Sequence, residues 1–78
     1  MSTLTIRKSN NATDVQFTEH SMKIFISDGR VLSIPLEWFP LLRDASTKDL
    51  EDWRLIGEGE GIHWNAIDED ILVANLLN

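Results

Sequence analysis

The segment Met22-Lys23-Ile24-Phe25-Ile26-Ser27-Asp28-Gly29-Arg30-Val31-Leu32-Ser33-Ile34-Pro35-Leu36 decides the fold, because it places two alternating stretches around one turn signal. Apolar side chains occupy every second position on both sides of the turn, as in strands with one buried face: Met22, Ile24, Ile26, Leu32, Ile34 and Leu36. Asp28-Gly29 predicts a two-residue type I′ turn, in which both central residues have positive φ. Pro35 donates no backbone hydrogen bond, so the second of these strands is predicted to be an edge strand or to end there.

A further strand precedes this hairpin. Val15 and Phe17 alternate with polar neighbours, which predicts a third antiparallel strand in a meander. Residues 1–13 are mostly polar, and we expect a flexible N-terminal segment there, followed by one domain over residues 14–77. With 78 residues in all, the chain buries only about 60% of its unfolded surface, so a partner subunit would supplement its small core.

Two short helical turns are predicted after the hairpin. Pro40 suits the first position of a helix, and Ser46 or Thr47 suits the cap of a second one. Leu50 and Trp53 are three residues apart, so we expect them to share a helical face that packs on the sheet. Such short helices need tertiary packing, and the residues expected to supply it by burial are Leu41, Leu42, Leu50, Trp53 and Trp38.

The C-terminal part is predicted to form turns and short strands. Gly57-Glu58-Gly59-Glu60-Gly61 indicates a turn or bulge with positive φ rather than a phosphate-binding loop, because two glutamates alternate with the glycines. A short strand is expected over residues 62–64 and a last buried strand over residues 71–74. The predicted class is therefore α+β, with a small antiparallel hairpin meander, one short helix packed on it and short C-terminal strands.

The negative charge lies in the second half of the chain. Thirteen Asp and Glu residues face seven Lys and Arg residues, which gives a net charge of −6. Acids and bases balance up to residue 39, so the whole excess comes from residue 40 onward. Nucleic acids and anionic membranes bind basic surfaces, so a basic protein is the expected partner, with no direct nucleic-acid or membrane binding. The sequence shows no targeting signal and no apolar run near the roughly 18 residues of a membrane span, and we expect a cytoplasmic protein.

The chemistry-bearing residues give no catalytic pattern. Cysteine is absent, which removes disulfides, thiolate nucleophiles and the usual structural zinc sites. His63 with Asp68 or Asp70 is the one pair that could hold a divalent metal or act as an acid–base pair, but the spacing matches no established ligand pattern. In a strand, His63 points away from the face of its apolar neighbours. We therefore expect no enzyme activity, no cofactor and no metal.

The three tryptophans have two interpretations. They are either anchors of an interface or the large apolar side chains of a small core. We expect Trp53 in the core and leave Trp38 open.

An ordered series of motifs resembles a known family. The series comprises Asp28-Gly29-Arg30, Ile34-Pro35-Leu36-Glu37-Trp38-Phe39-Pro40, Ala45-Ser46-Thr47, Trp53, Gly57, Gly59, Ile62-His63-Trp64 and Asp68-Glu69-Asp70-Ile71. Over residues 14–77 the chain is similar to DUF2442, a family of small bacterial domains of unknown function. The resemblance implies an antiparallel sheet with one short helix, and a setting beside a second small protein in toxin–antitoxin pairs. It implies no catalytic residues. Some members carry an appended helix-turn-helix domain that this sequence lacks, so no DNA-binding role is carried over.

The leading hypothesis is a small acidic protein-interaction module, resembling an antitoxin, that binds a basic protein such as a toxin encoded nearby. Its candidate interaction surface consists of Trp38, Glu58, Glu60, His63, Asp68 and Asp70. An exposed sheet edge is a second possible docking site. Two other classes remain open: a small metal-dependent enzyme that uses His63, and a homo-oligomeric structural domain that pairs through strand edges. The sequence does not identify the partner, the biological process or the oligomeric state.

Overall fold

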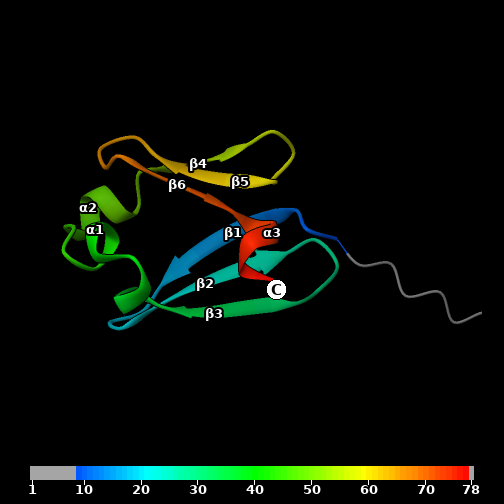
Figure 1. The fold of residues 1–78 in the computed structure, drawn as a ribbon, viewed down its shortest axis with the longest axis horizontal. Helices are drawn as coiled ribbons and strands as arrows, with labels where there is room; N and C mark the ends of the chain where they lie inside the picture. Colours follow the sequence, from blue (N-terminus) through cyan, green and yellow to red (C-terminus); the bar gives the residue numbers. More distant parts are fainter. Residues whose placement is uncertain (1–8, 78) are drawn as a thin grey trace, which may run out of the picture.

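The computed structural model, which describes residues 9–77, contains two three-stranded antiparallel sheets (Figure 1). The first sheet has the order β1 (Ala12–Phe17), β2 (Ser21–Ile26), β3 (Val31–Pro35), and the second has the order β4 (Trp53–Ile56), β5 (Gly61–Trp64), β6 (Glu69–Leu72). The connection between the sheets contains η1 (Leu36–Trp38), α1 (Pro40–Arg43) and α2 (Thr47–Leu50), and α3 (Val73–Leu76) follows β6. The α+β class and the meander are confirmed, and β3 ends at Pro35 on the edge of its sheet as predicted.

The hairpin turn between β2 and β3 differs from the predicted type. Gly29 N–H donates to Ile26 O at 3.0 Å, and Ile26 N–H donates to Arg30 O at 2.9 Å. Gly29 has a φ of +97°, but no described non-glycine residue has a positive φ, so the type I′ prediction for Asp28 is wrong. The loop is a type I turn followed by a left-handed glycine. The carboxylate of Asp28 accepts from Arg30 N–H at 3.1 Å, and this local bond holds the aspartate in the ordinary turn conformation.

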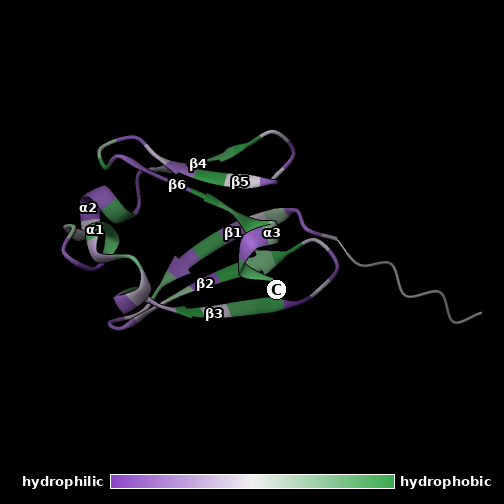
Figure 2. Cartoon of the chain, in the orientation of Figure 1, coloured by the Kyte–Doolittle hydropathy of each residue, from purple (hydrophilic) through white to green (hydrophobic). Residues whose placement is uncertain are grey.

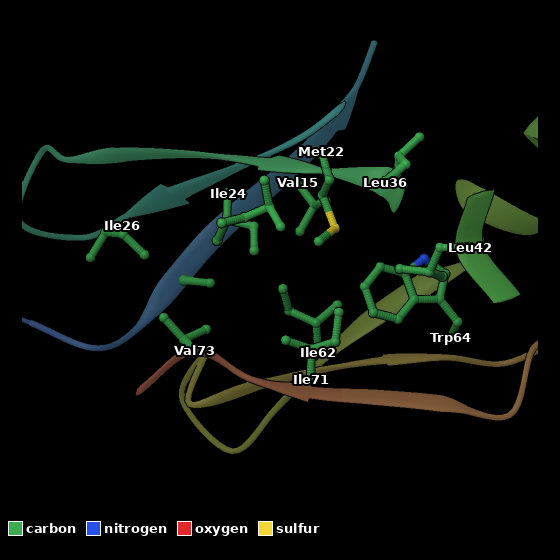
Figure 3. Packing of buried hydrophobic residues seen from close by; sticks show 12 residues of the cluster. Val15, Met22, Ile24, Ile26, Leu36, Leu42, Ile62, Trp64, Ile71 and Val73 are labelled. Carbon is green, nitrogen blue, oxygen red and sulfur yellow. The ribbon is translucent and has the colours of Figure 1, made fainter. Parts of the chain in front are cut away.

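The core lies between the two sheets, whose apolar side chains point toward one another (Figure 3). Trp64 is fully buried, and its ring meets Phe17 edge-on with centroids 6.4 Å apart. Its indole N–H donates to Leu50 O at 2.9 Å. Leu42 of α1 is also fully buried and belongs to the same cluster. The central aromatic residue is therefore Trp64, while Trp53, expected in the core, is half-buried at its side.

Two predicted helix boundaries are confirmed. Pro40 begins α1, and Ser46 caps α2 by accepting from Asp49 N–H at 3.2 Å. The predicted helical face shared by Leu50 and Trp53 is wrong, because α2 ends at Leu50 and Trp53 pairs with Trp64 in the second sheet.

The last predicted strand is too long. The strand β6 ends at Leu72, and Val73, expected within it, begins α3. Val73 N–H donates to Glu60 O at 3.0 Å, and the helical turn brings Leu76 and Leu77 against the core. A continued strand would have carried these two leucines past the short sheet.

The structured domain begins before residue 14. Ser9 N–H donates to a carboxylate oxygen of Asp28 at 2.9 Å, Ser27 N–H donates to Asn11 O at 2.9 Å, and Ala12 opens β1. Residues 9–13, expected to be flexible, are thus bonded to the β2–β3 turn. The rest of that expected segment, residues 1–8, lies outside the described residues.

One close backbone contact joins the two sheets. Ala12 N–H donates to Gly59 O at 2.7 Å, and Gly59 has a φ of +98°. A Cβ atom at Gly59 would overlap the carbonyl oxygen of Ala12. Only glycine satisfies both the conformation and the close approach.

Two glycine substitutions separate these requirements. We expect Gly29→Ala to lower the free energy of unfolding by about 1–2 kcal/mol, the cost of a left-handed alanine, because nothing lies near its new methyl group. Gly59→Ala adds the overlap with Ala12, so we expect a loss of about 3 kcal/mol or more. Urea unfolding followed by circular dichroism measures both. Equal losses in the two variants would show that the close contact between Gly59 and Ala12 can open without lowering the free energy of unfolding.

The pH dependence of stability tests the hydrogen bonds that Asp28 makes with Arg30 and Ser9. Hydrogen bonds from the Arg30 side chain and from Ser9 N–H lower the pKa of Asp28 from 3.8 to about 2. The folded state therefore binds this proton more weakly than the unfolded state, and the stabilisation is present above about pH 4 and is lost as the pH falls toward 2. We expect Asp28→Asn to be less stable than the wild type at pH 7 and to differ little from it near pH 2. Urea unfolding across this range measures the difference in the free energy of unfolding. The same difference at every pH would show that the ionised carboxylate of Asp28 does not stabilise the fold.

Candidate functional site

The outer face of the second sheet carries a row of three polar side chains. The register places His63 of β5 between Arg54 of β4 and Asp70 of β6. The Nδ1 atom of His63 is hydrogen-bonded to the carboxylate of Asp70, and the His63 side chain remains 29% exposed. Its neighbours Ile62 and Trp64 are fully buried on the inner face. The extended β6 thus brings together one histidine and one carboxylate that the sequence singled out.

This pair is a cross-strand hydrogen bond that orients the imidazole. Nucleophilic catalysis also requires a hydroxyl or thiol within hydrogen-bond reach of the histidine, and the register sets only Arg54 and Asp70 beside it. Within residues 9–77, no group of three or more His, Asp or Glu side chains is arranged to hold a metal ion. The geometry at His63 therefore supplies an ordered polar row in which Asp70 is hydrogen-bonded to the imidazole.

The remaining candidate residues lie in separate places. Glu58 and Glu60 belong to the turn between β4 and β5, and Asp68 belongs to the turn between β5 and β6, so they sit at opposite ends of the sheet (Figure 1). Trp38 is the last residue of η1. Of the six residues expected to form one surface, His63 and Asp70 are joined by a hydrogen bond.

Most of the carboxylates gather at one end of the molecule. The turn between β1 and β2, the connection through η1, α1 and α2, and the turn between β5 and β6 meet at this end (Figure 1). We call residues 18–20, 36–52 and 65–68 the acidic end. Against two bases, Arg43 and Lys48, it holds seven carboxylates: Glu19, Glu37, Asp44, Asp49, Glu51, Asp52 and Asp68. In Figure 2, hydrophilic segments alternate with hydrophobic ones along α1, α2 and the turns at this end.

One of the two bases is already neutralised. Arg43 donates to Asp44 at 2.9 Å and to Glu37 at 3.2 Å. These bonds raise the pKa of Arg43 above its usual range, and the bond to Arg43 lowers the pKa of Asp44. Exposed ion pairs add little to stability, but these two hold three side chains in place beside η1. With seven carboxylates and two bases, the formal net charge of the acidic end is −5 when His20 is neutral.

Two large apolar side chains are exposed within this acidic end. Trp38 is 62% exposed and Leu41 is 54% exposed, and they lie three residues apart in η1 and α1. Leu41 was expected to be buried, but α1 has a single turn, and its inward position is taken by the fully buried Leu42. An adjacent residue on a helix points about 100° away, which leaves Leu41 in solvent. Exposed tryptophan is typical of residues that anchor interfaces.

In the acidic run at the start of β6, the charged form of Glu69 is destabilised by its surroundings. Glu69 pairs with Trp64 on the inner side of the sheet and is half-buried. Burial raises the pKa of Glu69, and the charges of Asp70 and Asp68 raise it further. The ionised form of Glu69 is therefore disfavoured in the folded protein.

The fold and this surface define a small α+β domain with an acidic end that exposes Trp38 and Leu41. The family model described as "Protein of unknown function (DUF2442)" matches residues 12–78, so the chain belongs to this family, as its motifs indicated. No curated protein and no solved structure matches the chain. Within the described residues no helix is long and apolar enough to cross a membrane.

The raised pKa of Glu69 gives a stability prediction. The folded state binds this proton more tightly than the unfolded state, so the contribution of Glu69 to stability is highest below its ordinary pKa and falls as the pH rises above it. We expect Glu69→Gln to be more stable than the wild type at pH 7 and similar to it at pH 3. Glu58→Gln, in the exposed β4–β5 turn, is the control and should change stability little. Thermal unfolding at both pH values measures this. A Glu69→Gln variant that is less stable than the wild type at pH 7 would show that the charge on Glu69 does not destabilise the fold.

Proposed function

We propose that this protein is a non-enzymatic interaction module that docks its acidic end onto a basic surface of another protein. The observation that carries the proposal is the exposure of both Trp38 and Leu41, three residues apart, in the end of the molecule that also holds seven carboxylates. Interfaces of known strength often place an apolar anchor at the centre and charged groups at the rim. The acidic end has both parts.

The two parts have different physical roles. The negative field increases the rate of encounter with a basic partner and favours one orientation of approach. Burial of Trp38 and Leu41 then removes apolar surface from water, which is worth about 1.5–3 kcal/mol for a fully buried large side chain. Charge thus selects the class of partner, and the apolar pair holds it.

The arrangement favours a different chain as the partner. Two copies of the acidic end would repel each other, so self-association through this surface is disfavoured. The toxin–antitoxin setting implied by the family resemblance would supply a second small protein as a candidate partner. In that setting the module would act by covering a basic surface of the toxin, both sterically and electrostatically.

The test uses the binding partner recovered from the native host with the tagged full chain and then purified. We expect Trp38→Ala/Leu41→Ala to weaken binding roughly 30-fold or more, because both anchors are lost. Val31→Ala/Leu72→Ala removes side chains that are 50% and 54% exposed outside the acidic end, and it should leave the affinity unchanged. Isothermal titration calorimetry measures both affinities.

A second pair of variants tests the charge. We expect Asp44→Lys/Asp68→Lys to weaken binding and to reduce its salt dependence, because the two reversals lie in the acidic end. Glu58→Lys/Glu60→Lys makes the same change at the opposite end of the second sheet and is the matched control. Equal effects of the two pairs would reject the acidic end as the docking surface.

A further inference from the structure

A groove runs between the outer edge of β1 on one side and α2 with the first residue of β4 on the other. Gln16, Phe17 and Thr18 line one side, and Thr47, Leu50 and Trp53 line the other. The strand β1 is an edge of its sheet, since it pairs only with β2. The groove therefore lies beside a strand whose second side has no neighbouring strand.

The ladder shows which backbone groups face this groove. Thr18 N–H donates to Ser21 O at 2.8 Å, so these residues form a hydrogen-bonded pair. Hydrogen-bonded pairs alternate along an antiparallel ladder, so Gln16 and Lys23 form the next one. Val15 and Phe17 then direct their N–H and C=O groups away from β2. The bond from Val15 N–H to its neighbour Asp14, at 2.8 Å, agrees with this direction.

The groove lining combines apolar and negative groups. Phe17, Leu50 and Trp53 are each half-buried and give it an apolar wall. Its two charged lining residues are Glu19 and Glu51, which are both exposed carboxylates. An occupant that matches the lining has an extended backbone, an apolar side chain and neighbouring positive charges.

We propose that this groove binds an extended, lysine- or arginine-containing segment of a partner protein as an additional strand on β1. Backbone hydrogen bonds to the N–H and C=O groups of Phe17 and to the C=O group of Val15 provide the pairing. Alternate apolar side chains pack on Leu50 and Trp53, and the basic side chains meet Glu19 and Glu51. This inference rests on the proposed function, because it names the part of the basic partner that enters the groove.

The open part of the edge is short. Asp14 occupies the N–H of Val15, and Gly59 O accepts the N–H of Ala12 further along the strand. The added strand therefore pairs over only a few residues near Phe17. A guarded edge of this length also limits pairing between copies of the protein.

The experiment titrates the ¹⁵N-labelled full chain with the synthetic peptide acetyl-Lys-Val-Lys-Leu-Lys-Val-Lys-amide and follows its amide and indole N–H resonances by NMR. We expect shifts at the amides of residues 15–18 and at the Trp53 indole. The same peptide methylated on every backbone nitrogen should not bind, because neither of its edges can then donate hydrogen bonds to β1. Glu19→Lys/Glu51→Lys should weaken binding about tenfold, and Glu58→Lys/Glu60→Lys should leave it within about twofold.

The two indoles separate this proposal from the proposed function. Shifts confined to the Trp38 indole and to α1 would overturn the groove while supporting the acidic end as the docking surface. Equal binding of the methylated peptide would overturn strand addition. An absence of shifts in the groove at millimolar peptide would overturn the proposal as well.

Discussion

The burial of Trp64 connects the three parts of the molecule. Its ring packs edge-on against Phe17 of the first sheet, and its indole N–H is bonded to the backbone of Leu50 at the end of α2. Leu42 brings α1 into the same buried cluster. Large apolar side chains dominate the stability of a small core, and this one also satisfies its single polar group. The short helices, which have no stability of their own, keep their positions because they pack around this tryptophan.

The sequence predicted the structure correctly where the local pattern and the tertiary packing favour the same conformation. The alternation around Asp28-Gly29 predicted both strands of the hairpin, and Pro40 and Ser46 predicted the helix starts. The prediction failed where contacts with residues distant in the sequence determine the conformation. Trp53 has a helical spacing from Leu50, but pairing with Trp64 draws it into a strand. Residues 9–11 look like a polar tail, yet they are held by hydrogen bonds to the hairpin turn.

The candidate surface shows the same limit. The sequence located the excess negative charge, but the paths of the connections decide which carboxylates become neighbours. The turn bearing Asp68 reaches the same end as α1 and α2, whereas the turn bearing Glu58 and Glu60 points the other way. The exposure of Leu41 depends on its partner Leu42 filling the inward position, which no local pattern could reveal.

The order of strands has a consequence for how the chain folds. Each sheet pairs only consecutive strands, so both can form from contacts that are close in sequence, a topology associated with fast folding. The first sheet is complete in sequence at Pro35, but its inner face packs against residues that come later in the chain, Ile62 and Trp64 of β5 among them. During synthesis the first meander would therefore leave the ribosome with an uncovered apolar face. The docking of the second meander is then the step that removes this face from water.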